Sequence, residues 1–244
     1  MLLFGVGSAS FGPVWFGFVS ACGILSVLME KLAYEQRKLA LIEDFNVVFD
    51  GVSRENGVSL SEAWVIDDRG SDEERQAARN EDTETRWQDV PEKDIAYGYS
   101  CLSFFDEIGF RYYIPAYIVW YLRHMDDEDP KSLIFQSNTP AWITYALSPS
   151  GSGEIETYYL SRFEMFTPEE SKAIAHFLEF EAEVEAAFQL ESNQQVRESM
   201  LDDGFSLEEI EEHLRECDES YAKTGLPINR AGHGLERYWG QFLP

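Results

Sequence analysis

The sequence has 244 residues, of which 44% are hydrophobic and 14% aromatic, so it can form a packed core and is not a disordered chain. Aspartate and glutamate number 45 against 19 lysines and arginines, a formal net charge of −26. A field of this sign repels the phosphates of nucleic acids, which argues against such partners, and it attracts basic proteins or cations.

The first 29 residues carry no charged side chain, and residues 14–29 are densely apolar. This run predicts a membrane anchor, because a helix needs about 20 apolar residues to cross a bilayer. The basic residues that follow would hold the C-terminal bulk in the cytoplasm, tethered to the inner membrane. These residues are Lys31, Arg37 and Lys38. Glycines within the run argue against an anchor, and Met29 opens a good helix. A second interpretation is therefore that residues 1–28 are a non-native leader and Met29 is the native start.

Several helix starts can be predicted along the chain. Residues 30–49 have apolar side chains at helical spacing, which predicts an amphipathic helix. Four capping boxes, in which a Ser or Thr is followed three residues later by Glu, predict further starts. Their residues are Ser59 with Glu62, Ser71 with Glu74, Thr167 with Glu170, and Ser206 with Glu209. Pro91 predicts one more short helix directly after it.

Residues 101–123 are the most densely apolar and aromatic part of the soluble chain. Charged side chains interrupt the block, which argues against a membrane span. We expect Gly109 to break it and Pro115 to begin a new helix that continues to about His124. Because that helix is apolar nearly all round, it is predicted to be a buried core element.

Residues 132–163 are rich in β-branched and aromatic residues, which leaves a small β element and irregular helical turns as alternatives. The predicted fold class is therefore mainly α, with α+β as the alternative. We divide the chain into an apolar segment, residues 1–29, and a helical globular domain, residues 30–190. An acidic helical C-terminal extension follows over residues 191–244 and ends in a loop-like tail from residue 225.

The chain shows no standard catalytic, nucleotide-binding or metal-binding motif, so no cofactor is predicted. Glu209, His213 and Cys217 share one face of a predicted helix. A structural zinc site needs four ligands, so we predict no metal there. The three cysteines are far apart and odd in number, which favours free thiols in a reducing compartment.

The segment from Arg111 to Tyr117 contains the candidate binding residues. They are Arg111, Tyr112, Tyr113 and Tyr117. A buried arginine among aromatic rings must be paired or stacked, and the acids nearest in sequence are Asp106 and Glu107. The favoured interpretation is that this arginine has a structural role and stabilises the core. The alternative is an enzyme of unfamiliar type with an anion-binding pocket at Arg111.

The stretch FFDEIGFRYYIPAYIVWYL, with LSEAWVIDD before it and FTPEESKAIAHFLEF after it, resembles an uncharacterised bacterial domain family of unknown function. The shared pattern reads F-x-D…G-F-R-[FY]-Y-x-P-A-Y, and the likeness covers about residues 30–190. The family has no established activity, so the resemblance implies no catalytic residue. Small cytoplasmic proteins of this sort include immunity proteins that neutralise toxins.

The surplus of acidic residues is concentrated late in the chain. From Thr167 to Glu219, 17 acidic side chains accompany only three basic ones. The C-terminal helices should therefore present a negative face. Together with the missing motifs, this predicts a non-enzymatic interaction domain of the immunity or adaptor type, which binds a basic partner through its acidic surface.

Overall fold

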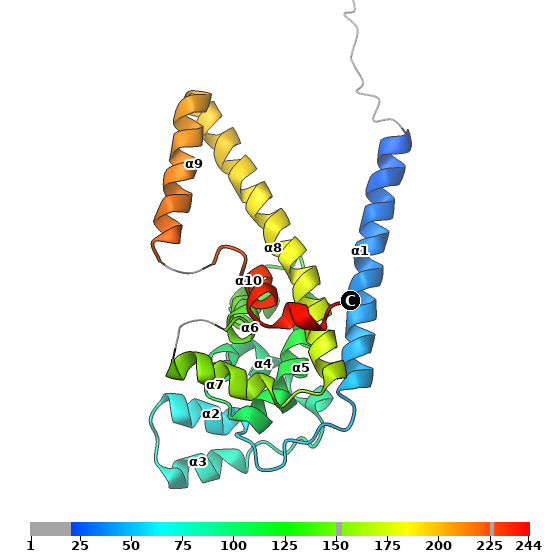
Figure 1. The fold of residues 1–244 in the computed structure, drawn as a ribbon, viewed down its shortest axis with the longest axis vertical. Coiled ribbons are helices and arrows are strands. Elements are labelled where there is room, and N and C mark those ends of the chain that lie inside the picture. Colours follow the sequence, from blue (N-terminus) through cyan, green and yellow to red (C-terminus); the bar gives the residue numbers. More distant parts are fainter. Residues whose placement is uncertain (1–20, 150–152, 225–226) are drawn as a thin grey trace, which may run out of the picture. The chain divides into compact units, whose positions relative to one another are not determined.

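The structure is a computed structural model that describes residues 21–149, 153–224 and 227–244. It divides into two units, residues 1–37 and residues 38–244, which are described separately. Every regular element in the described ranges is a helix, which confirms the mainly α prediction (Figure 1). The α-helices are α1 (Ala21–Val48), α2 (Leu60–Asp67), α3 (Asp72–Arg79), α4 (Glu92–Tyr97), α5 (Glu107–His124), α6 (Thr139–Leu147), α7 (Glu154–Phe163), α8 (Pro168–Asp202), α9 (Leu207–Ala222) and α10 (Arg230–Arg237). The 3-10 helices are η1 (Trp87–Asp89), η2 (Tyr99–Ser103), η3 (Ile134–Gln136) and η4 (Trp239–Phe242).

The first unit contributes described residues 21–37, which form the first turns of α1. Residues 14–20 of the predicted anchor (residues 14–29) lie outside the described residues, and so do residues 1–20 of the alternative leader (residues 1–28). Among the residues that the structure describes, no helix is both long enough and apolar enough to cross a membrane.

All four predicted capping boxes are present in the second unit, and they open α2, α3, α8 and α9. In each, the cap hydroxyl accepts from the backbone N–H three residues on, and the glutamate carboxylate accepts from the N–H of the cap residue. Two otherwise unpaired N–H groups are thereby satisfied at each helix start. The short helix predicted after Pro91 is α4.

The segment 132–163 forms η3, α6 and α7 in its described residues, which resolves the alternative between a β element and helical turns. Pro140 lies in the first turn of α6, where its missing N–H costs no helical hydrogen bond. The aromatic side chains that suggested strands instead pack inside a helical core, as Tyr159 and Phe163 do from α7.

The helix α5 runs without interruption from Glu107 to His124, so the predicted break at Gly109 and new start at Pro115 are wrong. The true N-cap is Asp106, whose carboxylate accepts from the backbone N–H of Gly109 at 2.8 Å. Every residue from 112 to 122 is buried, which confirms the predicted core element. Burial of this whole face outweighs the low helix propensity of the glycine and proline.

The start of α5 is packed directly against the backbone of residues 57 and 58. Asp106 also accepts from the N–H of Val58 at 2.9 Å, which fixes the two segments together. A methyl group on Gly57 would come within 2.5 Å of the backbone nitrogen of Gly109. A methyl group on Gly109 would likewise overlap the carbonyl oxygen of Val58. Two glycines are therefore required here by the close approach of two backbones.

We expect Gly109→Ala to lower the free energy of unfolding by about 3 kcal/mol, because overpacking against backbone forces the two segments apart. Chemical denaturation of the full chain measures this loss. Gly51→Ala is the comparison for conformation alone, since Gly51 has a φ of 73° and no atom within 4 Å of the added methyl group. A loss for Gly109→Ala below about 0.5 kcal/mol would contradict the proposed backbone contact.

The tail that was predicted to be loop-like contains α10 and η4 and returns to the core. Trp239 is fully buried, and its indole N–H donates to the carbonyl of Leu147 at 2.7 Å. Its ring lies 4.6 Å from that of Phe163 and 5.8 Å from that of Phe166. The aromatic residues of the tail therefore complete the core beside α7 and α8.

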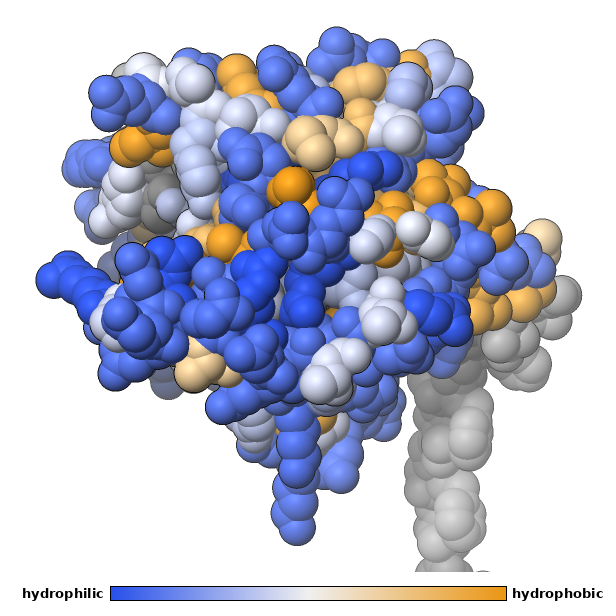
Figure 2. Space-filling view, turned by 90° about the horizontal axis from the view of Figure 1, so that it is seen from below, coloured by the Kyte–Doolittle hydropathy of each residue, from blue (hydrophilic) through white to orange (hydrophobic). Residues whose placement is uncertain are grey.

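Figure 2 shows the face of the second unit on which α2, α3 and α7 lie. Hydrophilic side chains cover most of this face, and the apolar ones form separate smaller groups. Most residues of α3 are charged or polar, and Ala78 is the one residue of this helix that is buried. On the face that Figure 2 shows, we therefore find no broad apolar area of the kind that marks a docking surface.

Candidate functional site

Arg111 is paired with an acid 59 residues away, Glu170 of α8. Its Nε donates to Oε2 at 3.0 Å and one terminal nitrogen donates to Oε1 at 2.8 Å, a bidentate contact. Glu170 is also the capping-box residue of α8 and accepts from the N–H of Thr167 at 2.9 Å. Neither Asp106 nor Glu107, the acids nearest to Arg111 in sequence, forms an ion pair with it within the described ranges.

The guanidinium of Arg111 remains partly accessible at the edge of an open depression. Its side chain is 30% exposed, whereas that of Glu170 is 2% exposed. The depression is bordered by the end of α1, residues 50–55 and the start of α8. The bidentate contact with Glu170 raises the pKa of Arg111. The carboxylate also balances the charge of the guanidinium, so this cation already has a partner within the folded chain.

The three candidate tyrosines of α5 lie in the core and do not share a surface with Arg111. The hydroxyl of Tyr113 donates to Glu84 at 2.9 Å and accepts from Arg54 and from the N–H of Leu60. Tyr117 donates to the carbonyl of Gly98 at 2.6 Å. Burial raises the pKa of all three tyrosines, including Tyr112, whose buried hydroxyl has no hydrogen-bond partner in the described chain. The structure thus separates Arg111 from the tyrosines that follow it.

Cysteine and histidine side chains form no metal centre in the described part of the chain. Cys217 and His213 are neighbours on α9, with Sγ 3.7 Å from Nε2, and Glu209 is occupied in the capping box of that helix. Cys101 is fully buried, and burial raises the pKa of its thiol to about 12. A thiol of that pKa is not a nucleophile at neutral pH.

The second half of α8 and the whole of α9 form a hairpin, which we call the acidic arm (residues 186–224). In α8 the last fully buried residue is Glu181, so the helix continues beyond the core (Figure 1). Ile210 and Leu214 of α9 are buried, and Arg197 of α8 binds Glu211 of α9 at 2.8 Å. Gly204, with a φ of 89°, turns the chain between the two helices. The arm is therefore a defined element of the fold.

Comparison with known proteins decides the family. The profile of a family of unknown function (DUF6714) matches residues 37–219, about three quarters of the chain. The chain belongs to this family. No match was found among the curated proteins or among the solved structures. The DUF6714 match extends past the 30–190 region of the predicted resemblance and includes most of the acidic arm.

The DUF6714 chain also contains a buried arginine that sequence reasoning missed, Arg162 of α7. It is 1% exposed, and its guanidinium carbon lies 4.2 Å from the ring centre of Phe110 and 4.4 Å from that of Tyr158. One terminal nitrogen donates to the carbonyl of Leu102 at 2.8 Å. The stacked arginine expected for the aromatic block therefore exists, but it comes from another helix. The only sequence signal was its place in a helix with aromatic residues around it.

Proposed function

We propose that the DUF6714 chain is a non-enzymatic interaction domain that binds a basic protein through its acidic arm. One observation carries the proposal, namely that surplus carboxylates and exposed apolar side chains occur on the same hairpin. Residues 186–224 contain eleven acidic side chains against three basic ones. Of the basic residues, Arg197 and Arg215 already bind glutamates within the arm. Most of the carboxylates therefore remain available to an incoming partner.

The turn of the arm combines apolar and acidic side chains. Three large apolar residues close to Gly204 in the sequence are exposed: Leu201 (46%), Phe205 (46%) and Leu207 (65%). Acidic residues alternate with them along the chain at Asp202, Asp203 and Glu208. Exposed apolar side chains surrounded by charged ones are typical of a docking surface. Burial of the apolar side chains increases the affinity, and the charges increase the association rate and the selectivity for the partner.

Partner capture is expected to depend on the charge of the arm. We expect the variant Glu208→Lys/Glu216→Lys/Asp218→Lys to lose a basic protein that the wild-type chain retains at low salt. None of these three carboxylates forms an ion pair within the described arm, so the helices should persist. The recovered protein is purified, and its dissociation constant is expected to rise about tenfold between 50 and 300 mM salt, as Debye screening increases.

A matched variant controls for net charge. Asp44→Lys/Glu81→Lys/Glu128→Lys changes the charge by the same amount at exposed positions outside the arm. It should retain the partner with little change in affinity. Equal loss in both variants, or affinity that is independent of salt, would overturn the role of the arm.

Two other predictions for this chain are not part of this proposal. An enzyme with an anion-binding pocket at Arg111 stays a prediction, and Glu170 already engages two donor positions of that guanidinium. A tether through residues 14–29 also stays a prediction. An immunity or adaptor role is the form of the interaction that the acidic arm fits best, because both roles require only surface contact.

A further inference from the structure

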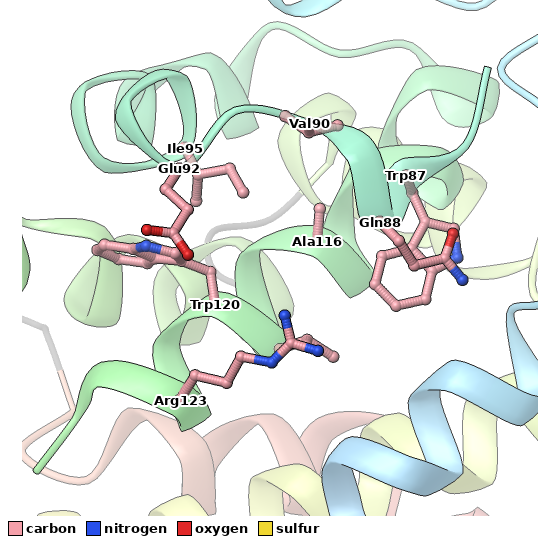
Figure 3. A pocket seen from close by; sticks show the side chains of 9 residues that line it. Trp87, Gln88, Val90, Glu92, Ile95, Ala116, Trp120 and Arg123 are labelled. Carbon is pink, nitrogen blue, oxygen red and sulfur yellow. The ribbon is translucent and has the colours of Figure 1, made fainter. Parts of the chain in front are cut away.

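Two hollows on the core of the second unit differ in the room that they offer to a ligand. Figure 3 shows the cleft between η1, α4 and α5, with Trp120 on one side and Trp87 on the other. Its free space is about 60 Å³, enough for a few water molecules only. A wider depression of about 250 Å³ lies between α6 and α10, two helices that pack against each other (Figure 1). The wider depression can therefore admit side chains of a ligand.

Aromatic rings form the walls of the wider depression. Its described lining residues are Ala141, Trp142 and Tyr145 of α6 and Arg230 of α10. The rings of Trp142 and Tyr145 are half-buried, with their centres 5.5 Å apart and their planes at 70°, so they meet as two sides of a corner. Tyr99 of η2 extends the row, with its ring centre 5.9 Å from that of Trp142. Tryptophan, tyrosine and arginine are the residue types that most often dominate the energy of binding interfaces.

The polar side-chain groups at the depression can donate hydrogen bonds, and they lack acceptors. Among the described residues, none accepts from the indole N–H of Trp142, the hydroxyl of Tyr145 or the guanidinium of Arg230. The guanidinium carbon of Arg230 lies 5.8 Å from the ring centre of Tyr145, which places these donors beside an apolar wall. A ligand that fits this site must therefore combine apolar groups with hydrogen-bond acceptors.

The charges around the depression favour a neutral ligand over an anion. Burial raises the pKa of Glu185, and the nearby charge of Arg230 opposes this rise. The cation of Arg230 is thus partly balanced within the fold, and the whole chain carries a net charge of −26. An anionic ligand would be repelled by that field. Neutral carbonyl oxygens would satisfy the same donors without this cost.

We propose that the depression between α6 and α10 binds a proline-rich segment of a partner protein. Proline has an apolar ring and no backbone N–H, so such a segment presents carbonyl acceptors and apolar groups with few donors. It is already extended as a polyproline II helix, which keeps the entropic cost of binding small. Grooves lined by aromatic rings recognise such segments in other proteins. The site lies outside the acidic arm, so this inference goes beyond the proposed function and is tested separately from it.

Three probes test the chemistry of the ligand on the full-length ¹⁵N-labelled chain. A capped decaproline peptide should shift the indole N–H signal of Trp142 and saturate it, whereas a capped Gly-Ser peptide of equal length should not. Benzoate tests the anionic alternative and should cause no saturable shift. The chain has six tryptophans, and the indole signal that is lost in Trp142→Phe identifies the one from Trp142.

A variant at an exposed position tests the place of binding without removing a core contact. Ala141 is exposed at the depression, so Ala141→Gln should fill part of it and weaken decaproline binding about tenfold. Ala187→Gln makes the same change at an exposed position of α8 and should leave the affinity unchanged. Retained indole signals show that each variant is folded. Absence of saturable decaproline shifts, an equal response to the Gly-Ser peptide or to benzoate, or unchanged affinity in Ala141→Gln would each overturn the proposed proline-rich site.

Discussion

Replacing Arg162 with alanine is expected to lower the free energy of unfolding by about 4 kcal/mol, one of the two largest effects we predict. The side chain is enclosed between Phe110 and Tyr158 and reaches the carbonyl of Leu102. Its removal would leave a cavity between the rings and an unpaired buried carbonyl, and each of these carries its own cost. Equilibrium unfolding in urea at neutral pH measures the change.

The substitution Arg162→Met separates packing from charge. Methionine refills most of the space and contacts aromatic rings favourably, but it cannot donate to Leu102. Burial lowers the pKa of Arg162, which reflects the cost of holding a charge there, and methionine removes that cost. We therefore expect a loss of about 1 kcal/mol for methionine. A loss as large as that of alanine would show that the cation itself, and not the filled space, stabilises this part of the core.

Stability is expected to fall as the pH rises through the range in which Glu181 ionises. Glu181 is 4% exposed, and its carboxyl oxygens accept from the hydroxyl of Tyr121 at 2.9 and 3.0 Å. Burial, with a contribution from nearby Glu185, raises the pKa of Glu181 to about 8. The folded state then holds a proton that the unfolded state releases near pH 4.5, so stability declines between these two values and levels off above pH 8.

The substitution Glu181→Gln isolates this effect, because glutamine imitates the protonated acid at every pH. Its stability relative to the wild-type chain should rise by about 4 kcal/mol between pH 5 and pH 9. Glu179→Gln, at an exposed position of the same helix, should show no such trend. Thermal or urea unfolding at four pH values is sufficient, and a stability difference that stays constant across pH would contradict a buried, protonated Glu181.

Local signals predicted helix starts well, and the reason is physical. A capping box is complete within four residues, so its geometry is decided by the chain itself, and all four boxes form. The helical break at Gly109 and Pro115 failed because tertiary burial of α5 overrides local propensity. The same burial turned the aromatic stretches after residue 132 into helices, although their composition suggested strands.

The candidate site was less predictable, because its contacts join distant segments. Arg111 was recognised, but its partner Glu170 was assigned only to a helix cap, and no local rule shows that one carboxylate serves both. Arg162 was missed because no pattern in the residues next to it in the sequence indicates that its cation is buried.

The order in which the chain leaves and re-enters the core has a practical consequence. The acidic arm is flanked on both sides by core segments, α8 before it and α10 with η4 after it. A single protease cut within the arm would leave two fragments that stay together through the contacts of Trp239 with Phe163 and Phe166. Ending the chain at residue 219, where the family match stops, would instead remove Trp239 and expose the rings of Phe163 and Phe166.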